Sequence, residues 1–238
     1  MKLVMVYGNA RRGSTWHYAN LLIEALKKRG LVETTEFTMP GDMPETCIGC
    51  FTCFKKGEDR CPHAGNVAPI AEATATADVI VLASPVYAMD VTGGMKSLLD
   101  HLCYRWLVHR PNPDLFNAVG VAVSTTAGAG LKHADKTLRS SLRFWGLKHA
   151  YSMKMAVAAA DWSEVSDVKK ARMRRTAEKT ADKVLRAMKR PFGSPMRRLA
   201  FLGIRGMMKN NTWGARDREY WLQNGWIDGE NPFRAARR

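Results

Sequence analysis

Four of the five cysteines lie within fifteen residues of one another, in the pattern C-x2-C-x2-C-x7-C. They are Cys47, Cys50, Cys53 and Cys61. Thiolates at this spacing can converge on an iron–sulfur cluster, and the Cys-Pro pair that ends the pattern also occurs in such sites. A zinc ion is a second interpretation, although structural zinc sites use separated Cys/His pairs, and a loop without metal is a third. His63 is expected at the surface rather than as a ligand, and Cys103 in the core.

A second group of candidate residues lies in a loop rich in glycine and hydroxyl side chains, residues 8–15. A predicted strand precedes this loop and a predicted helix follows it. Free N–H groups and the positive end of a helix dipole bind phosphate, and Arg11 adds a positive charge. The loop lacks both the Walker pattern and the Gly-x-Gly-x-x-Gly pattern of dinucleotide sites. Taken alone, it is also compatible with a tight turn that has a Ser/Thr cap.

The loop over residues 84–96 carries the most specific pattern in the chain. It begins Ser-Pro-Val-Tyr, continues through Thr-Gly and Met-Lys, and is followed by Asp100. In these features the chain resembles the NADPH-dependent FMN reductases and iron-sulfur flavoproteins. The resemblance implies that this loop wraps the flavin ring and that a third loop, residues 124–130, contacts the flavin side chain or ring edge. It also implies a 4Fe-4S cluster on the four cysteines, because iron-sulfur flavoproteins place such a motif between the second and third strands.

The three loops together define a predicted FMN site. Its residues are Asn9, Arg11, Ser14, Thr15, Ser84, Pro85, Val86, Tyr87, Thr92, Thr125, Thr126 and Gly128. In an open parallel sheet, ligands bind outside the carboxyl ends of the strands, where all three loops are expected. An acidic electron carrier such as a ferredoxin, or NAD(P)H, is the expected electron donor.

Short apolar runs rich in valine predict strands that are buried on both faces of a parallel sheet. The predicted strands are 2–7, 32–39, 78–84, 118–124 and 154–159, and helical periodicity covers 16–26, 95–106, 131–145 and 163–190. This alternation predicts an α/β fold, a flavodoxin-like doubly wound sheet of five parallel strands in the order 2-1-3-4-5. The last helix is expected to bury Val165, Val168, Ala181, Val184, Leu185 and Met188.

The chain is predicted to form an FMN-binding domain, residues 1–190, with a cysteine-rich insertion at 47–61 and a C-terminal extension, residues 191–238. Residues 163–238 contain 19 Lys and Arg against 8 Asp and Glu, and so supply +11 of the net charge of +15. The aromatic side chains of the extension are expected to pack on the domain or on a neighbouring subunit. They are Trp213, Tyr220, Trp221 and Trp226. The mixture of leucine and arginine over 196–208 would also suit a membrane surface.

Several classes of protein are excluded by what the sequence lacks. It has no Ser-His-Asp arrangement, metalloprotease motif or carboxylate pair for hydrolysis, and no signature of a specific nucleic-acid-binding module. No apolar run reaches the roughly 18 to 20 residues of a membrane span, and no signal segment precedes Gly8, so a cytoplasmic location is expected.

The expected function is that of an FMN-dependent redox protein, an iron-sulfur flavoprotein that passes electrons between a protein carrier and an acceptor as a homodimer or homotetramer. The alternative is an NAD(P)H-dependent FMN or quinone reductase without a cluster.

Overall fold

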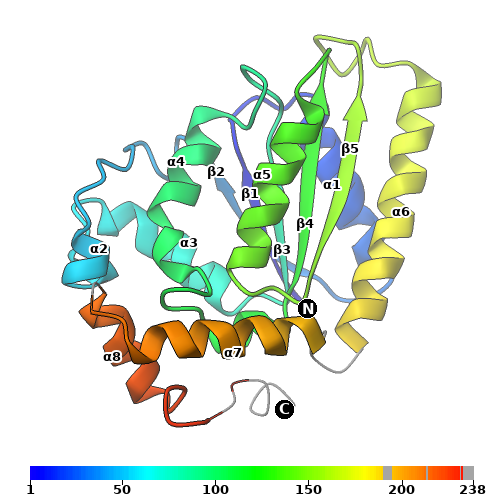
Figure 1. Ribbon diagram of the computed structural model, residues 1–238. Helices are drawn as coiled ribbons and strands as arrows, with labels where there is room; N and C mark the ends of the chain where they lie inside the picture. The colour runs from blue at the N-terminus through cyan, green and yellow to red at the C-terminus, as the bar shows by residue number, and fades with distance from the viewer. Residues whose placement is uncertain (190–194, 213, 231, 233–238) are drawn as a thin grey trace.

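The computed structural model describes residues 1–189, 195–212, 214–230 and 232. Its centre is a parallel sheet of five strands in the order β2-β1-β3-β4-β5 (Figure 1). The strands are β1 (Lys2–Tyr7), β2 (Glu33–Thr38), β3 (Val79–Ala83), β4 (Val119–Thr126) and β5 (His149–Ala156). The predicted flavodoxin-like fold class and strand order are therefore confirmed.

Helices cover both faces of the sheet (Figure 1). The core on one face includes residues of α1 (Ser14–Lys27) and α6 (Asp167–Lys189), and the core on the other face includes residues of α3 (Ala64–Ala75), α4 (Gly93–His101) and α5 (Leu131–Phe144). Along β3, Val79 and Val81 face the first core, whereas Ile80 and Leu82 face the second. Because β3 is buried on both faces, its sequence is a continuous apolar run.

The fifth strand begins earlier than predicted, at His149 rather than near residue 154. β5 lies at the edge of the sheet and pairs only with β4. Its first half mixes His149, Tyr151 and Ser152 and is only partly buried, which hides the strand from a search for apolar runs.

Two predicted helices have different bounds in the structure. α6 begins at Asp167, where an acidic side chain interacts favourably with the helix dipole. Val168 is 81% exposed, so its predicted burial is wrong. The helix predicted over 95–106 ends at His101, and a 3-10 turn, Cys103–Arg105, follows it. This turn lets Arg105 hydrogen bond to Ala71 and Thr74 near the end of α3.

The other expected core positions near α6 are covered to different degrees. Val165, Ala181 and Val184 are buried, and Leu185 and Met188 are partly buried against the same core. Val165 precedes the helix rather than lying within it.

The segment between β2 and α3 carries the four clustered cysteines. It contains α2 (Thr52–Lys55) and a 3-10 helix (Glu58–Arg60), neither of which the hydrophobic periodicity predicts. In Figure 1 it lies beside α3 and α4, away from the loops that follow β3 and β4.

The C-terminal extension contains α7 (Pro195–Lys209) and α8 (Ala215–Gln223), and α7 runs below the strands in Figure 1. A separate apolar cluster joins both helices to the domain. Its buried members are Phe116, Phe201, Met208, Trp221, Trp226 and Ile227. Tyr220 Oη donates to Pro111 O at 2.8 Å and Trp221 Nε1 to His109 O at 2.6 Å. The extension thus packs on the domain, as predicted; Trp213 lies outside the described residues. Within the described part of the chain, no helix combines the length and apolarity needed to cross a bilayer.

Candidate functional site

Residues of the three predicted loops meet at one cavity of about 160 Å³, outside the carboxyl ends of β1, β3 and β4. Of the predicted FMN residues, those that line it are Asn9, Arg11, Ser14, Thr15, Pro85, Val86, Tyr87, Thr125 and Thr126. The sequence did not single out Gly13, Ala127, Val157, Ala159 and Ala160, which also line the cavity. The last three follow β5, and the misplaced bounds of that strand concealed them.

One end of this cavity suits a phosphate group. α1 begins after Gly13, and no side chain caps its first N–H groups, which therefore remain available to a ligand. Beside them, Thr15 Oγ1 lies 2.6 Å from Thr125 Oγ1, which joins the first loop to the third. Arg11 is 57% exposed and donates to Ala160 O at 2.7 Å. The donors and the positive charge match a phosphate, and the residues present fit that part of FMN.

The other end is shaped by a tight turn after Pro85. Tyr87 and Asp90 exchange backbone hydrogen bonds of 2.8 and 3.0 Å, and Tyr87 Oη accepts a hydrogen bond of 2.9 Å from Asn9 Nδ2. Ala88 and Met89 have φ of 45° and 72°, a left-handed conformation that non-glycine residues adopt at a cost in free energy. Tyr87 stays half exposed, so its ring is free to contact a planar ligand.

Three predicted FMN residues lie outside the cavity. Thr92 caps α4, where it accepts from Met95 N, and its hydroxyl donates to Gly8 O. Ser84 Oγ accepts from Thr92 N at 3.0 Å. A Cβ on Gly8 would lie 2.7 Å from Thr92 Oγ1, so glycine is required for this close approach. Gly128 N donates to Thr126 Oγ1 at 3.2 Å. These residues hold the loops together, and their predicted direct contact with FMN stays a prediction.

All five cysteines line a different cavity, of about 340 Å³. Cys103 is partly exposed and faces this cavity, so its predicted place in the core is wrong. The reason is the early end of α4, which turns Cys103 away from the apolar stripe on which a longer helix would have placed it. The flavin-loop cavity and the cysteine cavity share no lining residue. The loop that carries Tyr87 leads into α4, and the last residues of α4, Asp100 and His101, line the cysteine cavity. The nine residues of α4 span roughly 13 Å.

The thiols of this cavity differ in acidity. A hydrogen bond with the Thr52 side chain lowers the pKa of Cys50. Burial raises the pKa of Cys53, and the nearby Arg110 guanidinium opposes this effect. Burial, together with Cys53 and Cys47, raises the pKa of Cys103 to about 12.

Two histidines adjoin Cys61. His63 Nδ1 lies 2.9 Å from His101 Nε2, and His101 Nδ1 lies 2.8 Å from Ser97 O. The ligand atoms of Cys61, His63 and His101 all lie within 4.8 Å of one another. His63 is partly buried, and its expected place at the surface rather than among the ligands stays a prediction. The pair was missed because the fold brings His101 from α4 to a residue 38 positions away in the sequence.

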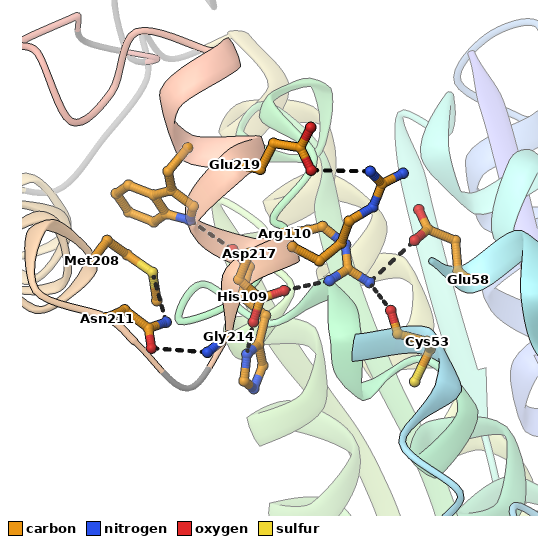
Figure 2. A network of polar contacts seen from close by, with 11 residues as sticks. Cys53, Glu58, His109, Arg110, Met208, Asn211, Gly214, Asp217 and Glu219 are labelled. Carbon is orange, nitrogen blue, oxygen red and sulfur yellow. Dashed lines mark hydrogen bonds and ion pairs between the residues drawn. The ribbon is translucent and has the colours of Figure 1, made fainter. Parts of the chain in front are cut away.

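A network of charges centred on the buried Arg110 and Asp217 attaches the cysteine segment to α8 (Figure 2). Arg110 donates to Cys53 O at 2.7 Å, contacts Glu58 at 3.1 Å and pairs with Asp217. Asp217 is fully buried and also lies 2.7 Å from His109 Nδ1. A single guanidinium therefore links the loop that carries Cys53 to the C-terminal extension.

Comparison with known proteins identifies the family. Residues 1–163 match the family of NADPH-dependent FMN reductases. The chain belongs to this family. An iron-sulfur flavoprotein of Archaeoglobus fulgidus is 28% identical over 149 residues, 62% of this chain and 64% of that protein. One of Methanocaldococcus jannaschii is 33% identical over 151 residues, 63% of this chain and 74% of that protein.

Another iron-sulfur flavoprotein of Methanocaldococcus jannaschii matches over only 61% of its own length, so this family member spans less than two thirds of some relatives. Solved structures agree with the fold. An FMN-dependent NADH-azoreductase of Bacillus anthracis, in complex with FMN, superposes with a TM-score of 0.59 at 10% identity, over 77% of this chain and 99% of that one. An NADH:FMN oxidoreductase superposes with a TM-score of 0.53 at 18% identity, over 76% and 89%.

Proposed function

We propose that this chain is an FMN-dependent oxidoreductase of the iron-sulfur flavoprotein type, which passes electrons from a protein carrier to an acceptor. The observation that carries the proposal is the cavity where the three predicted loops meet, because it combines an uncapped helix start with a turn that presents Tyr87. FMN, when bound, supplies hydride and electron transfer at its ring.

The residues of the chain have separate tasks in this proposal. The first N–H groups of α1 and the charge of Arg11 bind the phosphate. Thr15 and Thr125 offer hydroxyl groups next to it, and Tyr87 covers the ring from the strained turn. The buried Thr92 and Ser84 hold this turn against β1, so the ring and the phosphate keep a fixed separation.

The four clustered cysteines are the proposed ligands of a 4Fe-4S cluster. Their fit to this group is supported by their common cavity and by the backbone carbonyl of Cys53, which Arg110 holds in place. Phe51 and Phe54 line the same cavity and would shield the cluster from water. Lys55, Lys56 and Arg60 are exposed residues of the same segment and would attract an acidic carrier such as a ferredoxin.

Replacement of one ligand tests the proposal. In Cys50→Ser purified without oxygen, we expect FMN to remain and iron, acid-labile sulfide and electron transfer from the carrier to be lost. The matched control is Cys103→Ser, a thiol in the same cavity that is outside the proposed ligand set. FMN is measured by its visible absorbance and iron by elemental analysis.

A second candidate function, favoured by the family match, is an NAD(P)H-dependent FMN or quinone reductase without a cluster. Unmutated protein that holds stoichiometric FMN, but neither iron nor sulfide after reconstitution, would establish it in place of the first.

We also propose that the protein is cytoplasmic and that it forms a homo-oligomer. Four clustered thiols that are free of disulfides suit the reducing cytoplasm. Exposed apolar residues on α7, among them Leu199 and Leu202, suit a contact with a second copy of the chain, as a homodimer or homotetramer.

A further inference from the structure

A third cavity, of about 380 Å³, shares Cys53, Cys61 and His101 with the cysteine cavity. It extends along α3 and past the 3-10 turn Cys103–Arg105 to Tyr220 of α8. Its volume lies in the range of small-molecule sites. None of its lining residues belongs to the flavin-loop cavity, so a ligand bound here would lie outside the proposed FMN site.

Arg105 lines this cavity and is only 4% exposed. Its Nη1 donates to Ala71 O at 3.2 Å and to Thr74 Oγ1 at 2.7 Å. Its other N–H donors have no protein acceptor, and no carboxylate lies within ion-pair distance of it, among the described residues. Because Arg105 lines the cavity, a hydrogen-bond acceptor on a ligand can use these donors.

The walls of the cavity favour a flat ligand. α3 supplies four alanines at helical spacing, which form one smooth stripe. They are Ala64, Ala68, Ala71 and Ala75. The aromatic rings of Tyr104 and Tyr220 line the same space. Small side chains leave room for a ring, and aromatic neighbours pack well against it.

The charges of the cavity do not favour an anionic ligand. Glu58, Asp59 and Glu72 line it, but Arg110 pairs with Glu58 and Asp217, and Arg60 pairs with Asp59. Among the described lining residues, this leaves the Glu72 carboxylate to offset the charge of the Arg105 guanidinium. This balance suits an uncharged ligand that carries a hydrogen-bond acceptor for Arg105.

We propose that this cavity binds an uncharged, planar ring of the quinone class, with a carbonyl oxygen that accepts a hydrogen bond from Arg105. Its place beside Cys53 and Cys61 suits an electron acceptor. That role rests on the proposed function, whereas binding itself does not.

A titration of FMN-loaded protein with 2-methyl-1,4-naphthoquinone, followed by calorimetry without NAD(P)H, tests the proposal. We expect Ala68→Phe, which fills the cavity, and Arg105→Gln, which removes the donor charge, each to weaken binding by tenfold or more. Gly65→Phe is the matched control, because it adds the same ring at an exposed position of α3 with open space around it. Circular dichroism and FMN absorbance check that each variant is folded.

Two results would overturn the proposal. Unchanged binding in Ala68→Phe would place the quinone elsewhere, for example on the flavin. Tighter binding of the anionic 2-sulfonate of naphthoquinone than of the neutral quinone, dependent on Arg105, would show a site for anions. Failure of the unmutated chain to bind FMN would refute the proposed function, and the same titration of the FMN-free chain and its variants would then test quinone binding at this cavity by itself.

Discussion

At the scale of single residues, Arg11 is the charge that most directly tests the flavin assignment. Its guanidinium is more than half exposed at the phosphate end of the cavity, where it donates to a backbone carbonyl and lies 3.6 Å from the exposed carboxylate of Asp161. A hydrogen bond to a charged group contributes about 1.5–3 kcal/mol. Arg11→Ala should therefore weaken FMN binding by roughly 10- to 100-fold and riboflavin binding much less. Fluorescence titration with both ligands measures this, and Arg12→Ala, outside the cavity, is the control. Equal losses for both ligands would show that the phosphate binds elsewhere.

Cys50 allows a second test, in protein freed of metal. The hydrogen bond with Thr52 favours the thiolate and so lowers the pKa of Cys50. Thr52→Val should raise this pKa and slow alkylation of Cys50 near neutral pH, because less thiolate is present. Cys103 should stay unreactive until the pH approaches its pKa of about 12. Mass spectrometry of iodoacetamide adducts reports each thiol separately. An unchanged rate at Cys50 in the variant would contradict the assigned role of Thr52.

The cavity residues that the sequence predicted best are those fixed by local chemistry. Arg11 and Tyr87 belong to loops whose residue types indicate a ligand site, and both residues line the flavin-loop cavity. Thr92 has the same chemistry, but its hydroxyl is used within the fold, which no local pattern reveals. The sequence did not indicate a role for His101 or Arg105, because each contacts a side chain more than 30 positions away in the sequence.

At the scale of elements, the buried strands were predictable and the edge strand was not. β3 and β4 are buried along their whole length, so their sequences are rich in apolar residues and predict strands. β5 is an edge strand, and Ser152 and Lys154 on it contact Asp135 of α5 instead of filling a core. The same limit applies to the part of the α8 attachment that Asp217 makes, because Asp217 is one acidic residue in a basic segment.

Asp217 should contribute more to stability than any exposed acidic residue. It is fully buried between Arg110 and His109, and its removal leaves a buried guanidinium with a weaker partner. Loss of one member of a buried ion pair costs about 3–5 kcal/mol. Asp217→Ala should lower the free energy of unfolding by that amount, measured in urea. Asp182→Ala breaks an exposed pair with Arg29 and should cost less than about 1 kcal/mol. Similar losses in both variants would refute the importance of the network.

At the scale of the whole molecule, the family match ends at residue 163, and the extension lies beyond it. The extension nevertheless contributes to the cysteine region, since α8 supplies Asp217 to the network and Tyr220 to the third cavity. Its outer face keeps Leu199, Leu202 and Met207 exposed on α7. An apolar face in a basic segment suits either a second copy of the chain or an anionic membrane.

Removal of residues 191–238 separates these alternatives. The truncated chain would expose Phe116 and leave Arg110 without Asp217, so we expect lower stability and faster alkylation of Cys53. If α7 is an interface, the oligomeric state measured by light scattering should also fall, while neither form sediments with vesicles that contain phosphatidylserine. The truncated chain should keep the phosphate end of the flavin-loop cavity, because residues of the extension do not line that cavity in the described structure. A truncated protein that stays stable and keeps its oligomeric state, but loses vesicle binding shown by the full chain, would instead establish α7 as a membrane-surface helix.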